Sequence, residues 1–124
     1  MRYGMIGGGE GSFIGPVHRM AAALDGEATL VCGAFSTDRA RNARTAATLG
    51  LPAGRTYADV HAMLAGEAAL PADTRMQALA IVTPNHLHAP AAIAALDAGF
   101  DVLSEKPMAA SLAEGEAIAD AVRR

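Results

Sequence analysis

The chain has 124 residues, of which 52% are hydrophobic and 19% are charged, and its formal net charge is −3. This length suits a single domain that buries a core without needing a disulfide or a metal. The mildly acidic balance gives no reason to expect nucleic acid or a membrane surface as a partner. No apolar run reaches the roughly 18 residues of a membrane span. Cys32 is the single cysteine, and the start lacks a signal-peptide pattern, so we expect a cytoplasmic protein.

Short apolar runs alternate with longer alanine-rich segments along the whole chain. The apolar runs predict strands at 3–6, 28–35, 76–83 and 101–104, with a short strand at best at 55–57. Helices are expected over 14–24, from a cap at Ser36–Asp38 to Leu49, after a cap at Asp59, from a cap at Asn85 to Ala98, and from the capping box of Ser111 and Glu114 to Val122. One apolar stripe is expected on the first helix, made by Val17, Met20, Ala21 and Leu24.

Strands that alternate with helices of this length indicate an α/β fold, a doubly wound parallel sheet of the Rossmann type with helices on both faces. The economical strand order is 3-2-1-4-5. Ligands bind such sheets at the carboxyl ends of the strands, where the strand order reverses. We therefore expect a site in the loops that follow Ile6, Phe35, Thr83 and Ser104.

A glycine-rich turn directly follows the first strand and opens the first helix, which is the context that a dinucleotide-binding fingerprint requires. Gly7 allows a tight turn, and Gly9 lets the backbone approach a pyrophosphate. Regular spacing would put the third glycine at Ser12, so we interpret Gly15 as that glycine, after an insertion of about three residues. The alternative is a turn that binds nothing. The predicted cofactor contacts from this turn are Gly7, Gly9, Ser12, Phe13, Ile14 and Gly15.

The end of the second strand bears on the choice of cofactor. An acid usually stands there and holds the adenine-ribose hydroxyls, but this chain has Ser36, followed by Thr37 and then Arg41. A hydroxyl with arginines nearby accepts a 2′-phosphate, so these residues lean slightly towards NADP over NAD. The alternative for Arg39 and Arg41 is a solvated place on the helix surface, and we interpret Asp38 as the helix cap.

Two further loops carry the runs Thr83-Pro84-Asn85-His86-Leu87-His88 and Ser104-Glu105-Lys106-Pro107. Together with the Gly-x-Gly at 7–9, these runs resemble the N-terminal half of the Gfo/Idh/MocA oxidoreductases, the relatives of glucose–fructose oxidoreductase and inositol 2-dehydrogenase. The resemblance extends from Tyr3 to Val122. Its most specific parts are the Thr-Pro-Asn-x-x-His run and the Glu-Lys-Pro triplet.

The resemblance implies roles for single residues. Asn85 and His88 match positions near the nicotinamide and its ribose, and Glu105 matches an acid that hydrogen-bonds this ribose. Lys106 matches the active-site lysine, and Pro107 matches a proline that often follows a cis peptide bond. Hydride transfer from an alcohol needs a group that takes the hydroxyl proton or stabilises the oxygen, which suits Lys106; the alternative is an ordinary surface lysine. The predicted cofactor contacts from these loops are Thr83, Pro84, Asn85, His88, Glu105, Lys106 and Pro107.

The other histidines and the cysteine receive plainer interpretations. His86 and His88 are not expected to bind a metal, because their rings should lie on different sides of the helix start and no cysteine or acid pair supports them. His18 and His61 are interpreted as helix-surface residues, and Cys32 as an inert core thiol.

The resemblance also implies a last strand of the nucleotide-binding domain and a second α/β domain that this chain does not contain. We therefore expect residues 1–124 to be an incomplete NAD(P)-binding domain of an oxidoreductase that acts on a sugar, cyclitol or related polyol. We expect this piece to be inactive alone and the full-length form to be a homo-oligomer. The alternatives are an NAD-dependent glycosidase of the same family and a non-catalytic nucleotide-binding module. A reductase of another Rossmann family, such as dihydrodipicolinate reductase, is opposed by the Glu-Lys-Pro context.

Overall fold

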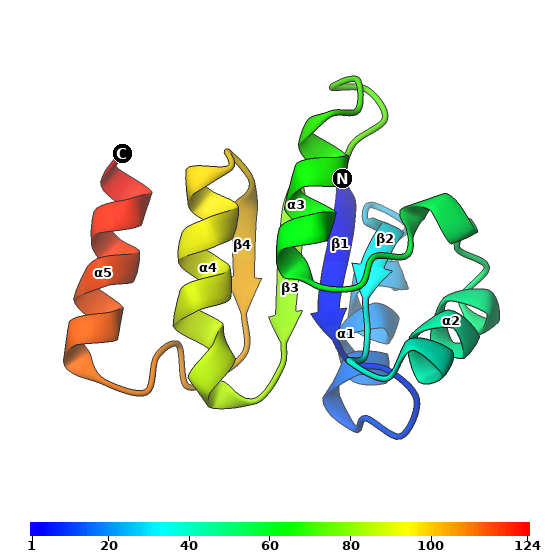
Figure 1. Ribbon diagram of the computed structural model, residues 1–124, viewed down its shortest axis with the longest axis horizontal. Helices are drawn as coiled ribbons and strands as arrows, with labels where there is room; N and C mark the ends of the chain where they lie inside the picture. The colour runs from blue at the N-terminus through cyan, green and yellow to red at the C-terminus, as the bar shows by residue number, and fades with distance from the viewer.

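In the computed structural model, residues 1–124 form a parallel sheet with helices on both sides (Figure 1). The strands are β1 (Arg2–Gly7), β2 (Thr29–Ala34), β3 (Ala78–Val82) and β4 (Asp101–Ser104). The helices are α1 (Ile14–Ala23), α2 (Arg39–Thr48), α3 (Val60–Ala68), α4 (His88–Asp97) and α5 (Leu112–Arg123), with 3₁₀ turns η1 (Ala53–Arg55) and η2 (Asn85–Leu87). This architecture confirms the predicted Rossmann-type α/β fold. No helix combines the length and the apolar character needed to cross a membrane.

The strands are arranged in the order β2-β1-β3-β4. The predicted strand at 55–57 is wrong as a strand, because only one bridge forms there, between Gly33 and Thr56. Residues 53–55 wind into η1 after Pro52, so only Thr56 reaches an extended conformation beside β2. This bridge still lies on the outer side of β2, which is the place that the predicted order gives to the missing strand.

The strand register brings the carboxyl ends of all four strands to one edge of the sheet. Gly7 pairs with Val82, and Ile81 pairs with Ser104. Beyond that last pair, the backbone N–H of Glu105 donates to the carbonyl oxygen of Ile81 at 2.9 Å. The loops after β1, β3 and β4 therefore begin side by side.

Helices α3 and α4 lie in front of the sheet and α1 lies behind it (Figure 1). Leu79 and Ile81 of β3 pack into the front core, and Ala78, Ala80 and Val82 pack into the core on the other face. This alternation explains the continuous apolar run of β3, which is buried on both faces. The expected cover on both faces is incomplete at β4, where Leu103 is 57% exposed.

The prediction for the apolar stripe of α1 is wrong. Val17, Met20 and Leu24 face outward and are 43%, 66% and 83% exposed, respectively. The reason is the rotation of the helix about its axis, which puts Gly15 against the turn that holds Gly8. The residues that follow Gly15 on the same face therefore point inward, and that inner face consists of Ile14, Gly15, His18, Arg19 and Ala22.

The expected helix caps are mostly present. Side chains of Asp38, Asp59 and Ser111 accept backbone N–H groups at the starts of α2, α3 and α5. Asn85 is not the cap of α4, because Leu87 holds that position and makes no side-chain cap. Residues 85–87 are used in η2, where the N–H of Leu87 donates to the carbonyl of Pro84 at 2.9 Å.

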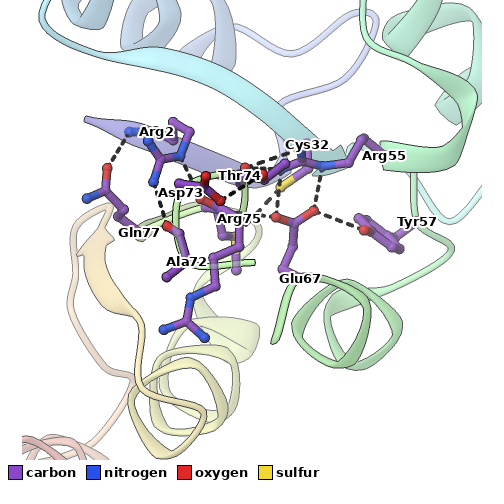
Figure 2. A network of polar contacts seen from close by, with 11 residues as sticks. Arg2, Cys32, Arg55, Tyr57, Glu67, Ala72, Asp73, Thr74, Arg75 and Gln77 are labelled. Atoms are coloured by element: carbon purple, nitrogen blue, oxygen red, sulfur yellow. Dashed lines mark hydrogen bonds and ion pairs between the residues drawn. The ribbon is translucent and has the colours of Figure 1, made fainter. Parts of the chain in front are cut away.

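A buried carboxylate, that of Glu67 in α3, organises the edge of the front core (Figure 2). The guanidinium of Arg55 donates to both of its oxygens at 2.7 Å, and the hydroxyl of Tyr57 donates to one of them at 2.9 Å. The backbone N–H of Met76 donates to the other at 2.8 Å. This network ties η1 and α3 to the segment that enters β3, and the sequence patterns above do not predict it.

Candidate functional site

A cleft of about 1120 Å³ opens at the carboxyl edge of the sheet, between the glycine turn, the start of α2 and the loop after β3. Eight of the predicted cofactor contacts line it, namely Gly7, Gly9, Ser12, Ser36, Thr37, Arg41, Thr83 and Pro84. Lining residues that sequence analysis missed include Glu10, Arg44 and Asp59. The cleft thus lies where parallel sheets of this topology bind ligands.

The glycine turn is held in shape by contacts that tolerate no side chain. Gly7 has a φ of +75°, in the region that favours glycine. A Cβ on Gly15 would lie 2.5 Å from the carbonyl oxygen of Gly8, so only glycine allows the helix to start this close to the turn. From behind, the guanidinium of Arg19 donates to the same Gly8 oxygen at 2.8 Å. Gly15 therefore packs closely on the turn, which is the role of the third glycine in a dinucleotide-binding fingerprint.

Thr83 carries an observation that points to a ligand. Its Oγ1 is buried and has no hydrogen-bond partner, although the residue lines the cleft. A buried hydroxyl without a partner loses hydrogen-bond energy. A small shift that exposes this hydroxyl to the cleft would let it pair with a polar group bound there. The glycine turn at a helix start and this unpaired hydroxyl both fit a dinucleotide, whose phosphates and ribose hydroxyls are hydrogen-bonding groups.

The α2 side of the cleft carries cations. Arg41 and Arg44 both line it. The Arg44 guanidinium donates to one carboxylate oxygen of Glu10 at 2.9 and 3.1 Å, which links α2 to the glycine turn. The carboxylate of Asp38 accepts the backbone N–H of Arg41 at 2.8 Å, and this hydrogen bond is the main reason that the pKa of Asp38 is lowered. Asp38 therefore acts as a helix cap, as predicted.

The loop after β4 lies at the same edge, beyond the lining of the cleft. Lys106 is exposed, and its backbone N–H donates to the carboxylate of Glu105 at 3.1 Å. The peptide bond between Lys106 and Pro107 is cis. The predicted contacts that do not line the cleft are Phe13, Ile14, Gly15, Asn85, His88, Glu105, Lys106 and Pro107.

His88 is buried, with 1% of its surface exposed, and its ring lies between the loop after β3 and the loop after β4. Its Nδ1 lies 2.8 Å from the carbonyl oxygen of Pro107, and its Nε2 lies 2.8 Å from that of Thr83. Each ring nitrogen thus has a backbone carbonyl oxygen within hydrogen-bond distance. No group of three or more His, Cys, Asp or Glu side chains in the chain is arranged to hold a metal ion.

The interpretation of His18 as a helix-surface residue is wrong. Its Nε2 lies 2.8 Å from Oε1 of Glu105, and the two side chains are only 18% and 21% exposed. The signal that could have found it is its spacing from Gly15, because a residue three positions along lies on the same helix face. Cys32 is buried as expected, and burial raises the pKa of its thiol to about 12.

Comparisons with known proteins find similarity along nearly the whole chain. The family described as an oxidoreductase family with an NAD-binding Rossmann fold, GFO_IDH_MocA, matches residues 1–124. The uncharacterized oxidoreductase YfiI of Bacillus subtilis is 38% identical over 119 residues, which are 95% of this chain and 30% of that protein. A D-xylose 1-dehydrogenase (NADP(+)) of Haloferax volcanii is 40% identical over 85 residues, 68% of this chain and 23% of that one.

An inositol dehydrogenase homolog from Azotobacter vinelandii is similar in structure, at 37% identity. In complex with NAD⁺ it superposes with a TM-score of 0.95, covering 99% of this chain and 31% of that one. In complex with NADH and myo-inositol the TM-score is 0.94, covering 99% and 32%. The chain thus spans less than a third of the length of these relatives. The family resemblance implies a last strand of the nucleotide-binding domain and a second α/β domain, and both remain predictions.

Proposed function

Because the chain belongs to the Gfo/Idh/MocA oxidoreductase family, we propose that it supplies the dinucleotide half of an enzyme that transfers hydride between a nicotinamide cofactor and a sugar, cyclitol or related polyol. The observation that carries this proposal is the shared edge of the sheet. This edge carries the glycine turn, the unpaired hydroxyl of Thr83 and the Glu105–Lys106 loop. The relatives named for D-xylose and inositol support the substrate class.

Each part of the edge has a separate task in this proposal. The backbone of Gly7–Gly9 and the start of α1 bind the pyrophosphate, because a helix N-terminus favours negative charge. Glu105 accepts a hydrogen bond from a ribose hydroxyl and so orients the nicotinamide end. A bound nicotinamide dinucleotide supplies or accepts the hydride. Lys106, exposed on its loop, takes the proton of the substrate hydroxyl or returns it.

The choice between NAD and NADP depends on the α2 side of the cleft. Ser36 carries no charge that would repel a 2′-phosphate, and Arg41 offers a cation to it, whereas the guanidinium of Arg44 is already paired with Glu10. These residues favour NADP(H). The NADP(+) named for the D-xylose dehydrogenase agrees with this preference, whereas the inositol dehydrogenase homolog is named with NAD⁺ and NADH.

The direct test is a titration of the 124-residue chain with NADH and with NADPH, followed by nicotinamide fluorescence and by calorimetry. We expect both to bind in the micromolar range, with NADPH the tighter ligand. Binding of neither at millimolar concentration would contradict the proposed function. Tight binding without any turnover in the full-length protein would favour the alternative of a non-catalytic module.

A further inference from the structure

His18 and Glu105 lie 87 positions apart in the sequence and meet at the carboxyl edge of the sheet. His18 comes from the inner face of α1, the helix that the glycine turn opens. Glu105 is the first residue after β4 and is anchored by its backbone N–H to Ile81 of β3. The contact therefore joins the pyrophosphate end of the proposed site to the loop that carries Lys106.

Two contacts of α1 with the glycine turn set the direction in which His18 points. Gly15 packs against Gly8 and sets the rotation of α1, and His18 follows three positions later on the same face. Arg19, the next residue, is held to the Gly8 carbonyl oxygen at 2.8 Å. The imidazole is thus placed by the same contacts that shape the glycine turn.

Both oxygens of the Glu105 carboxylate have a partner. Oε1 lies 2.8 Å from Nε2 of His18, and Oε2 accepts the backbone N–H of Lys106 at 3.1 Å. An ionised carboxylate only accepts hydrogen bonds, so Nε2 of His18 carries the proton that is shared. The pKa of Glu105 is lowered, first by the His18 hydrogen bond and then by the Lys106 N–H. The carboxylate is thus kept charged and held in one orientation.

We propose that His18 is a positioning residue for the nicotinamide end of the site, acting through Glu105. This inference rests on the proposed function, in which Glu105 binds the nicotinamide ribose. Without His18, one oxygen of Glu105 loses its partner and the side chain rotates more freely. Binding then has to order the side chain of Glu105, and this loss of conformational entropy weakens the binding free energy of the dinucleotide.

The test compares the binding of NADH with that of ADP, which is the adenine half of NADH without the nicotinamide riboside. NADH occupies both ends of the proposed site, whereas ADP lacks the nicotinamide riboside and does not reach Glu105. For His18→Ala we expect a Kd for NADH weakened by about tenfold, the size of one charge-assisted hydrogen bond, and an unchanged Kd for ADP. His18→Gln keeps an N–H donor and should restore most of the NADH affinity. Met20→Ala, an exposed change on the same helix, should change neither Kd.

A double-mutant cycle with Glu105→Ala separates action through Glu105 from a general effect. In the Glu105→Ala background, His18→Ala should have no further effect on the Kd for NADH. Equal weakening of ADP and NADH, unchanged NADH binding, or a full His18 effect without Glu105 would each overturn the positioning role while leaving the proposed function intact. If the unmodified chain binds neither NADH nor ADP, the proposed function fails and the positioning role fails with it.

Discussion

Gly15 at the start of α1 packs directly on Gly8 of the glycine turn, with no room between them for a side chain. This contact shapes the backbone at the proposed pyrophosphate position. It also sets the rotation of α1, and so it decides that His18 and Arg19 point inward while Val17 and Met20 face solvent.

Replacing Gly15 by alanine should therefore damage both stability and binding. The added Cβ meets backbone atoms of Gly8, and overpacking of this kind costs about 1–3 kcal/mol. We expect a lower free energy of unfolding in urea and a Kd for NADH weakened by about tenfold or more, since the phosphate cradle shifts. Gly54→Ala is the matched control, because nothing lies within 4 Å of its Cβ position. Equal behaviour of the two variants would contradict the role of this contact.

The buried carboxylate of Glu67 should contribute strongly to the stability of the fold. Glu67→Gln leaves the Arg55 guanidinium without its counter-charge, and breaking a buried ion pair costs about 3–5 kcal/mol. Urea unfolding followed by circular dichroism measures this loss. Glu116→Gln, an exposed change on α5, should stay within about 0.5 kcal/mol of the unmodified chain. A loss for Glu67→Gln as small as that of the control would show that the network is dispensable.

The thiol of Cys32 should make stability fall at alkaline pH. Burial raises its pKa from 9.0 to about 12, so the folded state keeps the proton while the unfolded state releases it. Its contribution is fully present below pH 9.0 and is lost as the pH rises towards 12. Cys32→Ala should flatten the decline of the free energy of unfolding across this window. A thiol reagent at pH 8 should label only the urea-unfolded chain, and equally fast labelling of the folded chain would argue against this shift.

Arg41 and Arg39 give a matched pair for the cofactor preference. Both are exposed on α2, but only Arg41 lines the cleft. Arg41→Ala should weaken NADPH by about tenfold, since a charge-assisted contact to the 2′-phosphate is lost, and leave NADH nearly unchanged. Arg39→Ala should change neither Kd by calorimetry. If the two variants behave alike, Arg41 is a solvated surface residue and the preference for NADPH has another source.

Lys106 should be required for turnover and not for cofactor binding. In the full-length protein, Lys106→Ala should lower kcat by about 10²–10⁴-fold, which is the usual worth of a general acid or base. NADH titrations should give a Kd close to that of the unmodified enzyme. Lys106→Arg keeps the positive charge but holds its proton, so its kcat should fall by a similar factor. A kcat close to that of the unmodified enzyme in either variant would remove Lys106 from the proton transfer.

Local patterns in the sequence predicted much of this protein. The apolar runs located β1 to β4, and most clearly β3, because a strand buried on both faces needs apolar residues at every position. Asp38, Asp59 and Ser111 were recognisable as caps, since a cap depends on backbone groups only two or three residues away. The glycine turn and the Glu-Lys-Pro loop were recognisable because each requires particular residue types at neighbouring positions.

Only the tertiary structure decided how these parts face one another. The rotation of α1 depends on the packing of Gly15 on Gly8, and the His18–Glu105 contact joins residues 87 positions apart. The network around Glu67 joins residues 9 to 12 positions apart, and none of these spacings is a repeat of a helix or a strand. For the same reason the stripe from Val17 to Leu24 misled, because packing of one glycine on another outweighs helix amphipathicity. The sequence alone thus determined the four strands and three of the helix caps, and tertiary packing determined which side chains meet at the edge of the sheet.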